Sequence, residues 1–229
     1  MQRLFDIFFS LIAIILLSPL LFLVIIILRL TGEGEIFFVQ PRIGLNQSKF
    51  GLIKFATMKK DSPNIGAGNL TIKDDPRVLP FGKYLRKTKI NELPQLFNIF
   101  RGEMSLIGPR PLTKISFDAY DRVSQDIISK VPPGLSGLGS IFFRDEESIL
   151  TGERASIDLY NRVIAPYKAS LEIWYVRNRS IKLYFTLIIS TLWVVLRTNS
   201  NVTEKWKIFQ DIPKPRKELK DLMKYDASR

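Results

Sequence analysis

The N-terminal segment is an almost unbroken apolar run. Between Leu4 and Leu30 it is interrupted only by Asp6, Ser10, Ser18, Pro19 and Arg29. The stretch from Ile7 to Leu28 carries no charge. Its length of about 22 residues gives about 33 Å of α-helix, enough to cross the apolar core of a bilayer. The run is too long for the apolar region of a cleaved signal peptide, and no small-x-small cleavage site follows it. We therefore expect a membrane helix over residues 1–30.

Ser18 and Pro19 lie near the middle of this run. A proline inside a helix removes one backbone hydrogen bond and bends the chain. Two structures fit the pattern: a kinked helix that spans the membrane, or a re-entrant helix that breaks at Ser18–Pro19 and leaves on the side from which it entered. Arg3 and Arg29 flank both ends, so the positive-inside rule gives no asymmetry and favours the re-entrant form.

The remaining residues alternate between short apolar stretches and Gly- or Pro-rich turns, which predicts an α+β domain. Strands are expected at 36–39 and 50–55, and helices at 81–88, 91–100 and over most of 156–196. The apolar stretch Ile181–Leu196, at about 16 residues, is short for a membrane span, which favours an interfacial or buried helix. We expect one small folded domain with amphipathic interfacial helices over residues 31–200, and a basic, membrane-interfacial tail over 201–229.

The predicted helix at 91–100 has its terminal signals in place. Asn91 is a good N-cap, Glu92 falls in the first turn where a negative charge is favourable, and Pro94 is tolerated there. Gly102 can end the helix, whose apolar stripe consists of Leu93, Leu96, Phe97 and Phe100.

The composition narrows the chemistry. The chain has 229 residues, a formal net charge of +12, and neither cysteine nor histidine. Disulfides, thiol nucleophiles, serine–histidine catalysis and the usual zinc sites are therefore excluded. Any metal must be a hard ion on oxygen ligands, for which magnesium is the first choice. The positive charge indicates polyanionic partners such as phosphorylated substrates, anionic lipid or nucleic acid.

Cations gather with a few carboxylates between residues 73 and 110. A Pro-Arg-Pro sequence holds Arg110, and Glu92 lies at a predicted helix start among the cations. Fixed arginines and helix N-termini are typical of phosphate binding, and a carboxylate among phosphates suits magnesium or a nucleophile that attacks phosphorus. A solvated surface of mixed charge is the competing interpretation for any single residue. The candidate metal ligand is Glu92, and the candidate phosphate ligands are Lys54, Arg77, Arg86 and Arg110.

A series of motifs runs through the chain. The central ones are Asp75-Pro76-Arg77, Leu85-Arg86, Asn91-Glu92-Leu93-Pro94-Gln95-Leu96 and Gly102-Glu103-Met104-Ser105-Leu106-Ile107-Gly108-Pro109-Arg110-Pro111. They resemble the core signature of the bacterial sugar transferases, the monotopic polyprenyl-phosphate phosphoglycosyl transferases. Further blocks that match the family in order are Ser18-Pro19, Phe38–Gly44, Lys54–Met58, Pro133–Gly137 and Tyr175–Ser180. The resemblance covers nearly the whole chain.

The resemblance implies a reaction and its setting. A sugar-1-phosphate passes from a nucleotide-diphosphate sugar, expected to be a UDP-sugar, to a membrane polyprenyl phosphate, and this initiates a surface polysaccharide or glycoconjugate. The family implies a re-entrant helix and a catalytic domain on the cytoplasmic face of the bacterial inner membrane, in contact with membrane lipid. It also implies magnesium as cofactor, linked to the carboxylate at Glu92, and places arginines of the motif at Arg86 and Arg110. The sequence leaves a monomer and a homodimer open.

The chain departs from the family at the nucleophile. Asn91 occupies the position of the family's attacking Asp, and a neutral carboxamide cannot serve as an anionic nucleophile. Ala56 also stands where the family often has Arg. Three accounts of Asn91 remain open: it caps a helix in an enzyme that transfers directly, its role passes to Glu92 or to a carboxylate of 145–147, or turnover is silenced.

Two other functions compete with catalysis by this chain. A catalytically weak relative could bind nucleotide sugar or polyprenyl phosphate in a glycan-assembly complex, and Asn91 favours that alternative. Release of nucleoside monophosphate from donor plus acceptor discriminates the two. A nucleic-acid binder rests on charge alone, because no helix-turn-helix or RNA-binding aromatic motif is present, so no nucleic-acid partner is expected.

Overall fold

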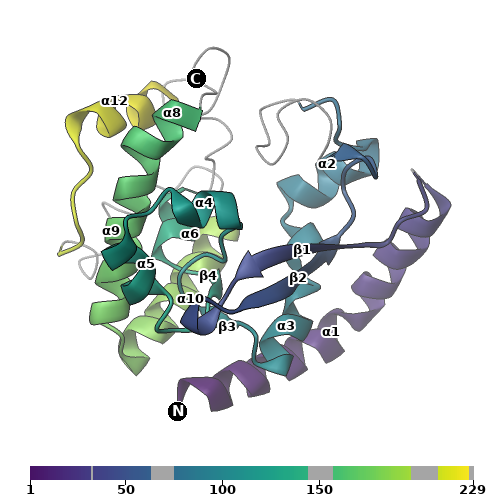
Figure 1. Cartoon of the computed structure of the whole chain (residues 1–229). Helices are drawn as coiled ribbons and strands as arrows, with labels where there is room; N and C mark the ends of the chain where they lie inside the picture. The colour runs from purple at the N-terminus through teal and green to yellow at the C-terminus, as the bar shows by residue number, and fades with distance from the viewer. Residues whose placement is uncertain (32, 63–74, 144–156, 197–210, 227–229) are drawn as a thin grey trace.

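The protein has the expected α+β architecture. A computed structural model describes residues 1–31, 33–62, 75–143, 157–196 and 211–226. Within them, helices surround two small sheets, an antiparallel pair and a parallel pair (Figure 1). The acidic cluster at 145–147, a candidate source of a substitute carboxylate, lies outside the described residues.

The elements follow one another in the chain with short connections. The strands are β1 (Phe37–Ile43), β2 (Lys49–Phe55), β3 (Ser105–Ile107) and β4 (Gly134–Ser136). Turns of 3-10 type lie at Leu45–Gln47 and Ile90–Glu92, and a π-helical turn lies at Tyr160–Ile164. The α-helices are α1 (Gln2–Leu30), α2 (Pro80–Lys87), α3 (Gln95–Arg101), α4 (Lys114–Asp118), α5 (Arg122–Ile128), α6 (Leu138–Phe142), α8 (Ile157–Leu159), α9 (Ala165–Arg177), α10 (Ile181–Leu196) and α12 (Lys217–Asp226).

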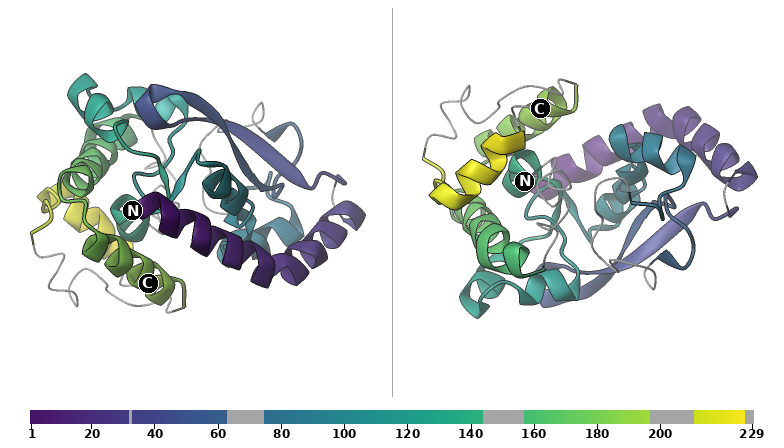
Figure 2. Two further views of the ribbon diagram at one scale, coloured as in Figure 1. Left: turned by 90° about the horizontal axis from the view of Figure 1, so that it is seen from below. Right: turned by 90° about the horizontal axis from the view of Figure 1, so that it is seen from above.

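The helix α1 is one continuous helix with Pro19 inside it. Figure 2 shows α1 changing direction near its middle, as expected where a proline removes a backbone hydrogen bond. The hydroxyl of Ser18 donates to the carbonyl of Ile15 at 2.8 Å. The expected interruption is therefore a bend within a helix and not an unwound segment. The helix is long and apolar enough to cross a membrane.

Both ends of α1 are attached to the same body. At its start, the Arg3 guanidinium donates to the carbonyls of Ile99 and Phe100 at the end of α3. Toward its far end, Val24 and Leu28 are buried with Phe55 of β2 and Leu85 of α2, and the Arg29 guanidinium donates to the adjacent Gly34 carbonyl at 3.2 Å. Between them, one face packs against the domain while the other exposes large apolar side chains, among them Leu4, Phe8, Leu11, Ile15, Leu16, Phe22, Leu23 and Ile26.

A buried polar group fixes the start of α1. Asp6 interrupts the apolar run, and its Oδ1 accepts from the Ser105 hydroxyl at 3.0 Å, the Leu106 N–H at 3.0 Å and the Tyr184 hydroxyl at 2.8 Å. Burying a carboxylate is costly unless it receives hydrogen bonds. These three bonds join α1 to β3 and α10.

The predicted helix at 91–100 is shorter than expected. The α-helix begins at Gln95, after Pro94 at its N-cap, and a separate 3-10 turn covers Ile90–Glu92. Gly102 ends the helix with φ of 93°, as predicted. The capping role expected for Asn91 is wrong, because its Oδ1 accepts no hydrogen bond within the described residues.

The other helices match the sequence pattern. The basic helix predicted at 81–88 is α2. The apolar segment Ile181–Leu196 is α10, which buries Leu183 and Leu187 in the main core and exposes Ile189. In the C-terminal tail, α12 packs on the domain through the buried Leu219.

Candidate active site

The loop that follows β3, residues 108–111, carries Arg110. The backbone N–H of Gly108 donates to the Ser136 carbonyl at 2.9 Å, which joins the loop to β4. A Cβ at Gly108 would lie 2.6 Å from the Pro132 carbonyl oxygen, so only glycine permits this close approach. The loop between the two prolines is thus held rigidly, and it projects Arg110 toward Glu92.

Arg110 and Glu92 form a weak ion pair. Arg110 Nη2 lies 3.9 Å from Glu92 Oε1, and the two side chains are 41% and 22% exposed. Glu92 ends the 3-10 turn that follows Lys89, whose φ of 60° turns the chain out of α2. A long pair in contact with water contributes little stability. Both groups therefore remain accessible to a ligand.

The hairpin β1–β2 supplies two more cations. In the antiparallel register Phe38 pairs with Lys54, and Arg42 lies further along β1 on the same face as Phe38. Gln40 lies between the two cations, and its Oε1 accepts from Arg42 Nη2 at 2.7 Å and from Lys54 Nζ at 3.1 Å. Arg42 Nη1 also donates to the Pro111 carbonyl at 3.0 Å, which joins the hairpin to the arginine loop.

The hairpin cations are poorly compensated. Burial, and next the nearby charges of Arg42, Arg86 and Arg110, lower the pKa of Lys54 to about 8, and the charge of Glu92 opposes them in part. Burial and then Arg110 lower the pKa of Arg42 to about 10. We call Arg42, Lys54, Arg86 and Arg110 the cationic cluster. Its charges repel one another and would be stabilised by a polyanion such as a diphosphate.

The structure separates two arginines that the sequence grouped together. Arg86 acts electrostatically on Lys54, so it belongs to the cluster. Arg77 is only 3% exposed, and its guanidinium binds the Asp75 carboxylate at 2.6 Å and the Ser62 carbonyl at 2.7 Å. This buried pair braces the loop before α2. The structure thus places Arg77 in a buried structural contact, apart from the other cations, and its role as a phosphate ligand stays a prediction.

A groove with a volume of about 400 Å³ runs from the ion pair along α10. Lys89, Glu92 and Arg110 supply its charged lining. The rest is mainly apolar, with Leu93, Leu106, Ile107, Leu135, Ile141, Phe143, Ile188, Leu192, Val194 and Val195 among the lining residues. We call this the apolar groove. Leu192 and Val195 are also exposed, so the groove opens onto an apolar outer surface.

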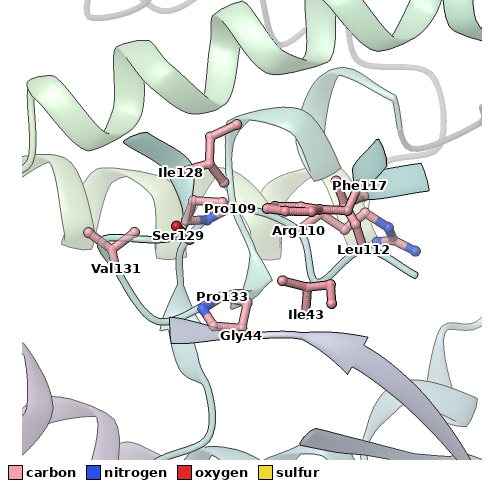
Figure 3. A pocket seen from close by; sticks show the side chains of 10 residues that line it. All are labelled: Ile43, Gly44, Pro109, Arg110, Leu112, Phe117, Ile128, Ser129, Val131 and Pro133. Carbon is pink, nitrogen blue, oxygen red and sulfur yellow. The ribbon is translucent and has the colours of Figure 1, made fainter. Parts of the chain in front are cut away.

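A much smaller cavity lies behind the arginine loop (Figure 3). Its volume is about 20 Å³, and its walls include Ile43, Pro109, Leu112 and Pro133. A space of this size can hold at most one water molecule. It is therefore no substrate site.

Asn91 and Glu92 differ in their surroundings. Glu92 lines the apolar groove and faces Arg110. Asn91 is 8% exposed, is not among the lining residues, and leaves its Oδ1 buried without a hydrogen bond in the described part of the chain. The geometry thus gives Glu92 access to a ligand in the groove.

Comparison with known proteins identifies the family. The family model for bacterial sugar transferases matches residues 1–198. The chain belongs to this family. It is 34% identical over 200 residues to an undecaprenyl-phosphate glucose phosphotransferase of Komagataeibacter xylinus, an alignment that covers 83% of this chain and 35% of that protein.

Other members of the family differ in length. An exopolysaccharide production protein PSS of Rhizobium leguminosarum bv. phaseoli is 31% identical over 198 residues, covering 84% of this chain and 93% of the relative. A UDP-N-acetylgalactosamine-undecaprenyl-phosphate N-acetylgalactosaminephosphotransferase of Aeromonas hydrophila is 33% identical over 197 residues, covering 85% of this chain and 43% of the relative. The chain thus spans about a third to nine tenths of these relatives.

The residues of this sugar transferase fit magnesium only together with a substrate. Within the described ranges no three acidic side chains come together to form a metal site. Glu92 is the one carboxylate among the groove-lining residues. Magnesium commonly binds through one or two carboxylates and completes its coordination with substrate phosphates and water. Glu92 beside the cationic cluster meets that requirement.

Sequence reasoning missed two residues of the site. Arg42 stands in a quoted motif, but only the hairpin register places it beside Lys54. Glu172 lies on α9, far along the chain, yet its carboxylate contacts the backbone of Arg110. A charged residue on the apolar face of a predicted helix is the signal that could have drawn attention to Glu172.

Proposed function

We propose that the chain transfers a sugar-1-phosphate from a nucleotide-diphosphate sugar, expected to be a UDP-sugar, to a membrane polyprenyl phosphate. One observation carries this proposal: the cationic cluster and the apolar groove meet at Glu92 and Arg110. The cationic cluster can bind the diphosphate of a soluble donor. A polyprenyl phosphate needs the cluster for its phosphate and the apolar groove for its isoprenoid chain. Relatives named as undecaprenyl-phosphate sugar phosphotransferases support the same substrates.

The proposed transfer is a substitution at phosphorus. An oxygen of the acceptor phosphate forms a bond to the donor phosphorus that bears the sugar. The bond from that phosphorus to the bridging oxygen breaks, and the nucleoside monophosphate leaves with the electron pair. Arg110 and Lys54 hold the phosphates in line and neutralise charge that shifts to the leaving group. Bound magnesium, held through Glu92, would supply further charge neutralisation.

Direct transfer is the mechanism that the site favours. Asn91 lacks the carboxylate that would form an acyl-phosphate intermediate, and its buried position keeps it out of the groove. Glu92 faces Arg110 and remains the possible substitute nucleophile. Incubation with labelled donor alone, followed by intact mass measurement, separates the two. Direct transfer gives no adduct, whereas an adduct on Glu92 would show a covalent route.

We further propose that α1 is re-entrant and that the domain lies on the cytoplasmic face of the inner membrane. Support comes from Pro19, from the bend, and from the contacts of both ends of α1 with one domain: Arg3 at the start, and Val24 and Leu28, buried with Phe55 and Leu85, toward the far end. A spanning helix would have to abandon one of these sets of contacts. A cysteine at position 2 should resist labelling from outside intact cells, and strong external labelling would show a spanning helix.

A binding protein without turnover is the second candidate, because Asn91 replaces the expected nucleophile. The test that decides is release of nucleoside monophosphate. Purified full-length chain in lipid nanodiscs is given polyprenyl phosphate, magnesium and a panel of nucleotide sugars. Release that depends on the acceptor supports the enzyme, whereas binding without release with every donor supports the second candidate.

A further inference from the structure

A buried carboxylate lies behind Arg110 and takes no part in the reaction proposed above. Glu172 on α9 is 2% exposed, and its Oε1 accepts the backbone N–H of Arg110 at 3.2 Å. Its Oε2 is buried and has no hydrogen-bond partner within the described residues. A buried oxygen without a donor destabilises the fold. Such a group is typical of a functional requirement.

The neighbouring elements are shaped around this carboxylate. On α6, Gly139 faces Glu172, and a Cβ there would collide with Glu172 Oε1. On α9, Tyr175 lies three residues further and donates its hydroxyl to the Ile107 carbonyl at 3.0 Å. Residues three apart share one face of a helix. One face of α9 therefore contacts the chain just before the arginine loop, at Ile107, and within it, at Arg110.

The charges around Glu172 act in opposite directions. The pKa of Glu172 is raised to about 7 because burial outweighs the lowering effects of the Arg110 N–H and of the charges of Lys168 and Arg110. Burial, and in smaller part the charge of Glu172, raises the pKa of the neighbouring Tyr175. Lys168 lies one turn earlier on α9, with its Nζ over the rings of Phe143 and Tyr160. The carboxyl group therefore changes charge near neutral pH.

We propose that Glu172 is a positioning residue whose ionised carboxylate holds Arg110 from behind and aims its guanidinium at a phosphate of the substrate. The carboxylate fixes the backbone N–H by a charge-assisted bond, and its charge favours the cationic side chain of Arg110. The identity of the substrate rests on the proposed function. The action of Glu172 on Arg110 rests on the contacts alone.

The ionised Glu172 that this role requires lowers the stability of the folded chain. Because the folded pKa of Glu172 is raised, the folded chain binds the proton more tightly than the unfolded chain does. The ionised form therefore destabilises the fold, and stability falls as pH rises from the ordinary range of a glutamate toward and through pH 7. A group kept only for packing would not need its charge. Stability and phosphate binding should thus respond to pH in opposite directions at Glu172.

The test uses the full chain in nanodiscs and inorganic pyrophosphate, which probes the phosphate site without a nucleotide. Glu172→Gln keeps the size of the side chain and an acceptor oxygen but removes the charge. Its affinity for pyrophosphate at pH 8 should fall on the order of tenfold, the scale of one hydrogen bond to a charged group. The ratio to wild type should shrink toward one at pH 5.5, where the protonated Glu172 of the wild type is uncharged like the glutamine of the variant.

The melting temperature supplies a second readout. Glu172→Gln should gain stability relative to wild type between pH 5.5 and pH 8, while its binding worsens. Glu218→Gln is the matched control, because that carboxylate is exposed on α12 and, within the described part of the chain, forms an ion pair with Arg162 alone. It should change neither the affinity ratio nor its dependence on pH.

Gly139→Ala separates position from charge. The added methyl group must displace the Glu172 carboxylate from the Arg110 N–H while leaving its charge in place. Weakened pyrophosphate binding in folded Gly139→Ala supports the positioning role. Any of three results would overturn the proposal. These are equal pyrophosphate affinity of wild type and Glu172→Gln at pH 8, a ratio of the two affinities that does not change with pH, and no pyrophosphate binding by the wild type. Pyrophosphate binding by a chain without turnover would contradict the proposed function alone.

Discussion

The cationic cluster and the apolar groove meet at Arg110 but are supported in different ways. Arg42 and Lys54 are anchored by the same oxygen of Gln40, and Arg42 also binds the backbone of the arginine loop. The apolar groove has few such constraints. Leu192 and Val195 line it and at the same time face outward from α10.

This difference matches the two substrates. A diphosphate has fixed geometry and is recognised by donors held in place, which is efficient only if they are oriented before binding. An isoprenoid chain is flexible and is recognised by apolar area without direction. Binding at the cationic cluster should therefore be sensitive to small changes in the position or charge of a side chain. Binding in the apolar groove should be sensitive only to changes in side-chain volume.

The largest effect should come from Glu92, which lies where the two regions meet. Glu92→Gln removes the one groove-lining carboxylate that could hold magnesium, so kcat/KM should fall by about a hundredfold or more, the scale of losing a group that stabilises charge in a transition state. Glu218→Gln is the control. A loss of less than about threefold would reduce Glu92 to a favourable charge near a helix start, worth about 0.3–1 kcal/mol.

Arg110 tests the rigid recognition of phosphate. Arg110→Ala should cost about 1.5–3 kcal/mol, which is roughly 10–150-fold in kcat/KM at limiting donor. Arg110→Lys should recover only part of this loss, because lysine lacks the planar fork. Full activity of either variant at limiting substrate would contradict the assignment.

The apolar groove is tested by two neighbouring positions on α10. Ile188 lines the groove, whereas the neighbouring Ile189 is 55% exposed and is not among the groove-lining residues. Ile188→Trp should raise the KM for a long polyprenyl phosphate about tenfold, as expected when about 1.4 kcal/mol of apolar contact is lost. Ile189→Trp should leave this KM unchanged. The KM for a short prenyl phosphate should be the same in both variants as in the wild type. Equal effects would place the acceptor elsewhere.

The smallest effect concerns the pH dependence of donor binding. The pKa of Lys54 is lowered to about 8, and phosphate binding favours its charged form. The contribution of Lys54 is therefore present below pH 8 and lost above it, so donor affinity should fall about fivefold between pH 8 and pH 9. Lys54→Met should bind more weakly and without this decline. An identical decline in both proteins would exclude Lys54 as its source.

The sequence by itself determined the apolar helix, the arginine loop and the helix that ends at Gly102. Each depends on signals within a short segment. The apolar helix has an uncharged run, the arginine loop has two prolines around Arg110, and the helix ends at a glycine, which can adopt the positive φ seen there. The family motifs likewise pointed to Glu92 and Arg110, which the structure brings to 3.9 Å of each other.

Only the tertiary structure decided the partners of each charge. Arg77 and Arg86 look alike in the sequence, yet one is buried against Asp75 and the other joins the cluster. Asn91 resembles a helix cap, yet the helix begins later. Glu172 reaches Arg110 across 62 positions of sequence. The reason is physical: a charged side chain is stabilised or destabilised by what packs around it, and contacts between distant segments leave no periodic pattern in the chain.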